Sequence, residues 1–178
     1  MAAGKKTAAR TSSESAVLED LLAPGLSVVF CGTGAGNRSA RIGAYYAGPG
    51  NRFWPTLYEI GLTPVRLAPG EWRRAPEFGI GLTDIAKRHV GPDSGLDPAG
   101  VDAEALKARI ENCRPRILAF TSKKAASLFL GRPTGRIDYG PQRETIGRTM
   151  IHVLPSPSGA ARGYWSLAPW RELAAAAG

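Results

Sequence analysis

The fold is indicated most clearly by residues 26–36, which read LSVVFCGTGAG. The apolar run at 26–31 is short and carries no charge, as expected of a strand that is buried on both faces of a sheet. The glycines that follow it predict a loop whose backbone can approach a ligand closely. In an open parallel sheet, ligands bind where such loops leave the strands, so residues 32–50 are the first place to look for a site.

Other apolar stretches along the chain have the lengths and spacings of strands and helices in alternation. Further strands are predicted within residues 78–85, 116–121 and 149–154. Helices are predicted at 14–22, with Ser12 or Ser13 as N-cap, and at 51–61, 101–112, 122–130 and 167–176. This alternation predicts an α/β fold with a mostly parallel sheet of four to five strands, covered on both faces.

Length and composition favour one folded domain with a basic surface. The chain has 178 residues, 43% of them hydrophobic and 21% charged, and its formal net charge is +8. Residues 1–13 are small, polar and basic, and we expect a disordered tail there, with a single domain at 14–178. The positive charge favours polyanions such as nucleic acid. No apolar run approaches the ~20 residues that span a bilayer, so we expect a cytoplasmic protein without a membrane partner.

Metal and nucleotide cofactors are not expected. The two cysteines, Cys31 and Cys113, are too few for an iron–sulfur cluster, and His89 and His152 lack the spacing of a zinc site. The loop at 32–36 resembles a dinucleotide fingerprint, but Asn37 stands where the third glycine belongs and no acidic residue follows at the expected distance. A glycine-rich turn without a ligand remains an alternative for this loop.

Four motifs resemble the family of mismatch-specific uracil-DNA glycosylases and thymine-DNA glycosylases. They are FCGTGAG at 30–36, GPGNRFW at 48–54, GIGLT at 79–83 and LPSPSG at 154–159. Their order and spacing are kept from about Leu18 to Leu173. The resemblance implies a three-layer α/β/α sandwich, no cofactor, and base excision from double-stranded DNA.

A flipped base needs an aromatic face to stack on and donors for its carbonyl oxygens. Tyr46 is our candidate for the stacking side chain, whereas Phe53 and Trp54 fit the core better. Backbone amides of the glycine-rich loop suit the carbonyl oxygens of a pyrimidine. The predicted substrate-binding residues are Gly32, Thr33, Gly34, Ser39, Tyr46 and Asn51.

Residues 155–163 resemble the family loop that enters the double helix and fills the gap left by the base. The predicted DNA-binding residues are Ser156, Ser158, Gly159, Ala160 and Arg162. The residue at the tip is Ala160, which is small for a wedge, so Arg162 is expected to fill space or to pair with the opposite base or a phosphate. An ordinary loop of serine and proline is the simpler interpretation.

The family usually orients the attacking water with an asparagine, and the matching position here is Gly34, which has no side chain. A carboxylate would be the better replacement, because it can also accept a proton from the water. We favour Asp93 for this catalytic role and place Asp84 second; Asn37 is shifted by three positions. Asp97 and Asp102 fit turn and cap roles. Lys87 is expected to contact phosphate or solvent rather than to form a Schiff base.

The sequence therefore predicts a monofunctional glycosylase that removes uracil from G:U mismatches. Its expected partners are double-stranded DNA with uracil mispairs and, for a relaxed pocket, single-stranded DNA. We expect a monomer, associated with the nucleoid through DNA. The main alternative is a catalytically impaired protein of the same fold that binds damaged DNA, for which Gly34 is the support. A nucleotide-cofactor enzyme is a third hypothesis, which the broken fingerprint disfavours.

Overall fold

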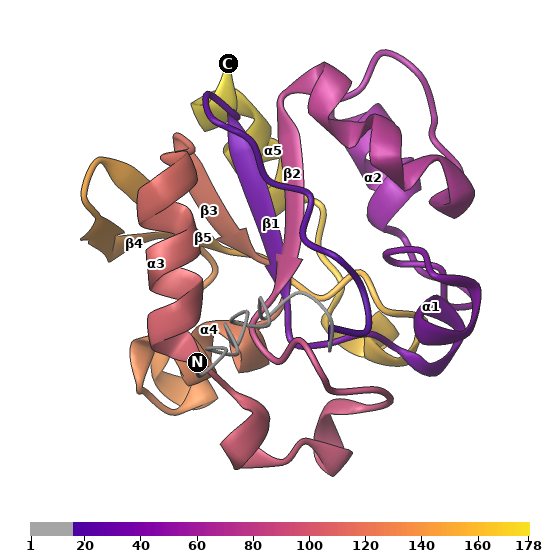
Figure 1. Cartoon of the computed structure of the whole chain (residues 1–178). Helices are drawn as coiled ribbons and strands as arrows, with labels where there is room; N and C mark the ends of the chain where they lie inside the picture. Colours follow the sequence, from indigo (N-terminus) through magenta and orange to yellow (C-terminus); the bar gives the residue numbers. More distant parts are fainter. Residues whose placement is uncertain (1–15) are drawn as a thin grey trace, which may run out of the picture.

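The computed structural model describes residues 16–178, which are built around one five-stranded sheet (Figure 1). The strands are β1 (Val28–Gly32), β2 (Ile80–Asp84), β3 (Ile117–Phe120), β4 (Gly140–Ile146) and β5 (Thr149–Val153). They lie in the order β2-β1-β3-β5-β4; β4 is antiparallel to β5, and the other neighbouring pairs are parallel. The prediction of a mostly parallel sheet is confirmed.

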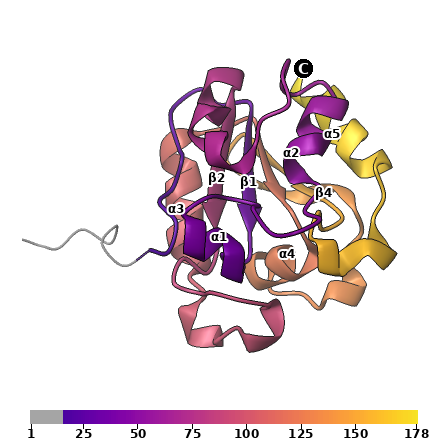
Figure 2. The same ribbon diagram turned by 90° about the vertical axis from the view of Figure 1, so that its right-hand side faces the viewer.

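Helices cover both faces of this sheet. They are α1 (Asn37–Ile42), α2 (Phe53–Glu59), α3 (Ala103–Cys113), α4 (Lys123–Leu130) and α5 (Ala168–Ala177). Short 3-10 segments are η2 (Pro69–Phe78), η3 (Asp93–Gly95), η4 (Pro98–Gly100), η5 (Thr134–Arg136) and η6 (Gly159–Tyr164). Helices α3 and α4 pack on one face, and α2 and α5 on the other (Figures 1 and 2). The three-layer α/β/α arrangement is thereby confirmed.

Strand β1 is buried on both sides, as its uninterrupted apolar sequence predicts. Val28 and Phe30 face the layer of α2 and α5, while Val29 and Cys31 face the layer of α3 and α4. The ring of Phe30 lies edge-on to Phe53 in α2, with the centroids 5.0 Å apart. Such aromatic contacts fix the helix that carries the GPGNRFW motif against the central strand.

Polar side chains cap α3 and α4 where the sequence predicts their first turns. Asp102 Oδ1 accepts a hydrogen bond from the Ala105 amide at 2.8 Å, and Ser122 Oγ accepts one from the Ala125 amide at 3.0 Å. These bonds satisfy amides that have no partner within the helix. Asp97 accepts a bond from the Ala99 amide at 3.0 Å, which confirms its turn role. Within residues 16–178, no helix is long and apolar enough to cross a membrane.

The helix predicted at 14–22 is wrong for the part that the structure describes. Residues 16–22 are not helical, and Leu21 forms an isolated antiparallel bridge with Leu82. The two residues exchange backbone hydrogen bonds of 2.9 Å in each direction. This pairing covers the outer edge of β2, whose backbone groups would otherwise lack partners. The predicted tail at 1–13 lies outside the described residues.

Strand β4 was not predicted, because its first residues fall in a segment that looks like a loop rich in glycine and proline. The strand reads GPQRETI and exposes most of its residues, as an edge strand can. The carboxyl ends of the parallel strands, by contrast, lie where the motif-bearing loops leave the sheet.

Candidate functional site

The candidate site lies at the carboxyl end of β1, where the strand order reverses. Strand β1 pairs with β2 on one side and with β3 on the other. The chain therefore adds β2 on one side of β1 and then returns to add β3 on the other side. Such a switch point leaves a crevice outside the strand ends. The segments after β1, β2 and β5 gather at this end of the sheet, which is the lower end in Figures 1 and 2.

Gly32, the last residue of β1, is surrounded by polar atoms from three other segments. A Cβ added to it would lie 2.6 Å from Asp84 Oδ1 and 3.6 Å from both Thr121 Oγ1 and the Tyr46 hydroxyl oxygen. Only glycine allows the Asp84 carboxyl oxygen to lie this close to the end of β1. A carboxyl group and two hydroxyl groups are thus brought to one point above the end of the central strand.

Asp84 is the most unusual member of this group. Its residue is 4% exposed, and burial, the largest cause, raises the pKa of its carboxyl to about 7. The charges of Lys87 and Arg109 oppose this rise in the pKa, while those of Asp20 and Asp93 add to it. Arg109 donates to the Asp84 carbonyl at 3.1 Å, but among residues 16–178 no donor reaches the carboxylate oxygens. A buried carboxyl without such a partner is costly unless a ligand uses it.

The two cations nearest to Asp84 are held by a different carboxylate, that of Asp20. Lys87 Nζ lies 2.7 Å from Asp20 Oδ1, and Arg109 Nε lies 3.2 Å from Asp20 Oδ2. Thr83 Oγ1 also donates to Asp20 at 2.6 Å. The Lys87 side chain is not freely solvated, because it is 17% exposed and also donates to the Tyr45 hydroxyl, while its contact with phosphate stays a prediction. Asp20 and Arg109 carried no signal in the sequence, since they lie far apart in it.

Tyr46 stands beside this group with one face of its ring covered. The ring stacks on Phe53 with the centroids 3.8 Å apart and the planes 19° from parallel. Its hydroxyl donates to Thr121 Oγ1 at 3.4 Å, and its φ of 55° is a left-handed conformation that few non-glycine residues adopt. Strain of this kind is frequent at functional sites. Thr121, which directly follows β3, was missed by the sequence analysis.

Asp93 is brought to the same end of the sheet by η3. Its Oδ2 accepts a hydrogen bond from Thr33 Oγ1 at 3.3 Å, and its negative charge contributes to the raised pKa of Asp84. Asp93 is exposed, whereas Thr33 is buried. Both predicted catalytic carboxylates therefore lie near the end of β1, one inside and one at the rim.

A side chain at the position of Gly34 would be tightly packed in this chain. A Cβ there would lie 3.0 Å from His89 Cβ and 3.1 Å from the Ala86 carbonyl oxygen. The segment after β2 thus closes over Gly34, and the same segment continues to Asp93. Asn37, the other residue considered in this loop, is exposed at the start of α1.

Ser39 and Asn51 hold the loop in place through their side chains. The buried Ser39 Oγ accepts a hydrogen bond from the Ala47 amide at 3.0 Å. Asn51 Oδ1 accepts one from the Phe53 amide at 2.9 Å, at the start of α2. These bonds position the backbone on either side of Tyr46, which is a supporting role beside the predicted contact with substrate.

The loop after β5 packs directly against the GPGN turn. The Arg52 amide donates to the Pro157 carbonyl at 2.8 Å, and a Cβ on Gly159 would lie 2.5 Å from the Pro49 carbonyl oxygen. Arg162 reaches back over Gly50, where an added Cβ would lie 3.1 Å from its Nη2. The two predicted loops therefore form one rim.

The outer side of this rim presents the predicted DNA-binding residues. Ser158, Ala160 and Arg162 are exposed, while Ser156 and Gly159 are half-buried. The Ser156 and Ser158 hydroxyls accept bonds from the amides of Ser158 and Ala160, each at 3.3 Å. Tyr164, which is 78% exposed, is an aromatic group on this rim that the sequence analysis missed. Its place two residues after Arg162 was the available signal.

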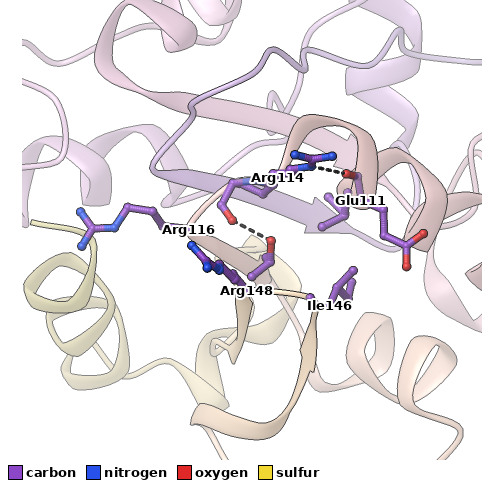
Figure 3. A pocket seen from close by; sticks show the side chains of 9 residues that line it. Glu111, Arg114, Arg116, Ile146 and Arg148 are labelled. Carbon is purple, nitrogen blue, oxygen red and sulfur yellow. Dashed lines mark hydrogen bonds between the residues drawn. The ribbon is translucent and has the colours of Figure 1, made fainter.

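A separate hollow of about 540 Å³ lies at the opposite end of the sheet. Figure 3 shows it between the end of α3 and the turn that joins β4 to β5, with Arg114, Arg116 and Arg148 around it. Its floor includes the buried Ile110 and Ile146. None of the residues predicted to carry chemistry lines it. Within the described part of the chain, no group of three or more His, Cys, Asp or Glu residues is placed to hold a metal ion.

Comparisons with known proteins agree with this fold. Residues 19–176 match the model of the family described as "Uracil DNA glycosylase superfamily". The chain is also similar to the solution NMR structure of a protein from Methanosarcina acetivorans described as a "putative Uracil DNA glycosylase". The TM-score is 0.59 at 20% identity, over 90% of this chain and 94% of that chain. At this identity the likeness to the solved structure concerns the fold.

Proposed function

The chain belongs to the Uracil DNA glycosylase superfamily, and we propose that it is a monofunctional DNA glycosylase that hydrolyses the bond between a flipped uracil and its deoxyribose. The observation that carries this proposal is the group around Gly32. A buried carboxyl that accepts no hydrogen bond from residues 16–178, two hydroxyls and a stacked tyrosine converge where the central strand ends. A base with carbonyl oxygens and a flat ring is complementary to that combination.

In this proposal the base stacks on the face of Tyr46 that Phe53 leaves uncovered. Its polar edge points toward Gly32 and Asp84, and the backbone amides of the glycine-rich loop lie near its carbonyl oxygens. The stacking of Tyr46 on Phe53 holds the tyrosine ring in place before the base arrives. Such preorganisation reduces the free energy needed to order the site around the base.

Asp93 is the residue that we assign to the water. Its carboxylate is at the rim, bonded to Thr33 beside Gly34, so it stands near the position that the family uses for this purpose. The closure of the chain over Gly34 by Ala86 and His89 accounts for the absent asparagine and supports a replacement from the following loop. Asp93 would orient the water and accept its proton as the water attacks the sugar.

The rim formed by residues 49–52 and 155–164 is the surface that we assign to DNA. The hydroxyls of Ser156 and Ser158 and the guanidinium of Arg162 suit phosphate oxygens or an opposite base. A net charge of +8 favours the approach to the polyanion. We propose uracil opposite guanine in double-stranded DNA as the central substrate, with uracil in single-stranded DNA as a further one, and a monomer as the active form.

A catalytically impaired protein that binds damaged DNA is the second candidate function. Gly34 favours it, because this position cannot orient a water molecule. The two candidates share the base pocket and the rim, and they differ only in whether Asp93 activates water.

A labelled duplex with one uracil, incubated with the protein and then treated with alkali to cleave abasic sites, separates these candidates. The proposal predicts a cut strand only after alkali, without added cofactor. Binding of the duplex without any cut strand would favour the impaired protein. A covalent adduct trapped by borohydride, or a cut before alkali, would contradict a monofunctional reaction.

A further inference from the structure

The loop between β2 and η3 is fastened to the glycine-rich loop on both sides of His89. The Ala86 amide donates to the Thr33 carbonyl at 2.8 Å, and the Gly91 amide donates to the Ala35 carbonyl at 2.9 Å. Bonds on both sides of a short segment limit its local movement. His89 is therefore held in a defined position relative to the end of β1.

The imidazole of His89 packs on Gly34. A Cβ added to Gly34 would lie 3.0 Å from His89 Cβ and 3.1 Å from His89 Cδ2. These distances are shorter than ordinary van der Waals contact between carbon atoms, so a side chain at this position would press on the ring. Gly34 thus gives the half-buried imidazole room beside the glycine-rich loop.

The far end of the ring is bonded to the backbone directly before Asp93. His89 Nε2 lies 3.1 Å from the Pro92 carbonyl oxygen. A carbonyl oxygen can only accept, so Nε2 carries the hydrogen and donates it. The same oxygen also accepts a bond from the Gly95 amide at 3.0 Å, in the turn of η3. The peptide unit that joins Pro92 to Asp93 is therefore held by two donors.

Asp93 needs such support, because it is exposed at the rim. Its carboxylate accepts a hydrogen bond from Thr33 Oγ1, but this bond is long, at 3.3 Å. A carboxylate on an exposed loop samples several positions, whereas a general base must stay within hydrogen-bond reach of the water. Displacement of a reacting group by about 1 Å can cost ~10²-fold in rate.

We propose that His89 is a positioning residue that holds the Asp93 carboxylate toward the attacking water through its bond to the Pro92 carbonyl. This inference rests on the proposed function, because it requires that Asp93 activates the water. In this assignment His89 acts through the backbone and contacts neither the base nor the water. The rate of excision should therefore depend on His89, while binding of the uracil duplex should not.

The test compares two replacements that differ in reach. His89→Gln places an amide nitrogen at about the position of Nε2, whereas the shorter side chain of His89→Asn ends near the position of Nδ1. Both amides are donors, but only the longer one reaches the Pro92 carbonyl. Variants of the full chain are assayed by single-turnover excision on a duplex with one G:U pair. Their Kd values are measured on the same duplex with a 2′-fluorine on the uracil nucleotide, which blocks excision.

His89→Ala and His89→Asn should be slower than the wild type by ~10–10²-fold, with Kd changed less than about threefold. His89→Gln should stay within about threefold of the wild-type rate, because it restores the bond. Ser94→Ala, which removes an exposed hydroxyl next to Asp93, is the matched control and should keep the wild-type rate. Circular dichroism melting sets the assay temperature below the unfolding transition of every variant.

A second arm removes the carboxylate that His89 is proposed to hold. In an Asp93→Ala background, a further His89→Ala change should alter the residual rate less than about twofold, because no base remains to be positioned. A purely structural role of His89 would instead reduce the rate in both backgrounds.

The inference is overturned by a wild-type rate for His89→Ala, by equal rates for His89→Gln and His89→Asn, or by the full additional loss in the Asp93→Ala background. A loss of duplex binding that accounts for the slower excision by His89→Ala also overturns it. A wild-type rate for Asp93→Ala removes the proposed base, and the inference with it. A wild type that excises no uracil overturns the proposed function itself.

Discussion

The two ends of the sheet differ in the kind of opening that they offer. At the amino end lies a hollow of about 540 Å³, with an apolar floor and exposed arginines around it (Figure 3). At the carboxyl end, a buried carboxyl, two hydroxyls and a stacked tyrosine gather around Gly32. The chemical groups at the two ends therefore distinguish the candidate site from the hollow.

Several polar groups at the amino end already have partners. Arg114 Nε donates to the Glu111 carbonyl at 3.4 Å, and Arg116 Nη1 donates to the Gly178 carbonyl at 3.1 Å. Thr149 Oγ1 donates to the Pro115 carbonyl at 2.7 Å. These bonds tie the ends of neighbouring elements together, as expected of structural contacts. At the carboxyl end, by contrast, no donor among residues 16–178 hydrogen-bonds to the Asp84 carboxylate oxygens.

The largest expected effect comes from a side chain added at the end of the central strand. Gly32→Ala places a Cβ 2.6 Å from Asp84 Oδ1, which displaces the carboxyl and blocks the base edge. We expect single-turnover excision of uracil to fall by more than about 10⁴-fold. Gly147→Asn, in the turn at the opposite end, is the control. Nothing lies within 4 Å of its added Cβ, and asparagine tolerates its φ of 56°, so activity should change less than about twofold. A Gly32→Ala variant with normal excision would contradict the site.

Removal of the Asp93 carboxylate tests whether the group that accepts the proton of the water also lies at the carboxyl end of the sheet. Asp93→Ala removes the group bonded to Thr33, and single-turnover excision should fall by ~10²–10⁴-fold while binding of the duplex is retained. Asp97→Ala, in the same loop, removes only a turn contact with the Ala99 amide and should stay near the wild-type rate. A near-wild-type rate for Asp93→Ala would remove this residue from the mechanism.

The buried carboxyl should also destabilise the fold as the pH rises. A carboxyl whose pKa is 3.8 unfolded and about 7 folded favours the folded state most below about pH 4. This advantage is lost between about pH 4 and pH 7, and the full rise in the pKa corresponds to about 4 kcal/mol. The unfolding free energy of Asp84→Asn minus that of the wild type should therefore be roughly 2–4 kcal/mol larger at pH 8 than at pH 4. Urea unfolding of both proteins at the two pH values checks this, and a pH-independent difference would contradict it.

The smallest expected effect is a difference in DNA binding between variants of Arg162, at the rim, and Arg148, at the opposite hollow. Arg162→Ala should weaken binding of the uracil duplex by about tenfold and reduce the salt dependence of binding by about one phosphate contact. Arg148→Ala, at the opposite hollow, should change neither by more than about twofold, apart from the general loss of one positive charge. Fluorescence anisotropy over a range of salt concentrations measures both. Equal losses for the two variants would mean that DNA binding depends on net charge alone.

The sequence predicted the parts of the fold in which local pattern and burial agree. Strand β1 and the loop at 32–36 were found because an apolar run followed by glycines has one straightforward interpretation. The cap Asp102 was found because its bond is local. The helix predicted at 14–22 is wrong for residues 16–22, because their conformation depends on pairing with the edge of β2. Strand β4 was missed because an exposed edge strand carries little apolar pattern.

The same division applies to the site. Tyr46, Asp84 and Asp93 were predicted because each follows a strand or stands in a loop at its end. The missed residues Thr121, Asp20 and Arg109 act across distances of tens of residues in the chain. Their importance depends on which strand neighbours β1, and that order is a property of the assembled sheet. The closure of the chain over Gly34 is of the same kind, because His89 is placed there by tertiary packing.

The most direct test of this account is a crystal structure of the Asp93→Ala variant bound to a duplex that contains one G:U pair. We predict the uracil outside the helix, its ring on Tyr46, and a carbonyl oxygen within about 2.6–3.2 Å of the Asp84 carboxyl. A uracil that remains stacked in the duplex, or a base that lies in the hollow beside Arg114 and Arg148, would contradict the account.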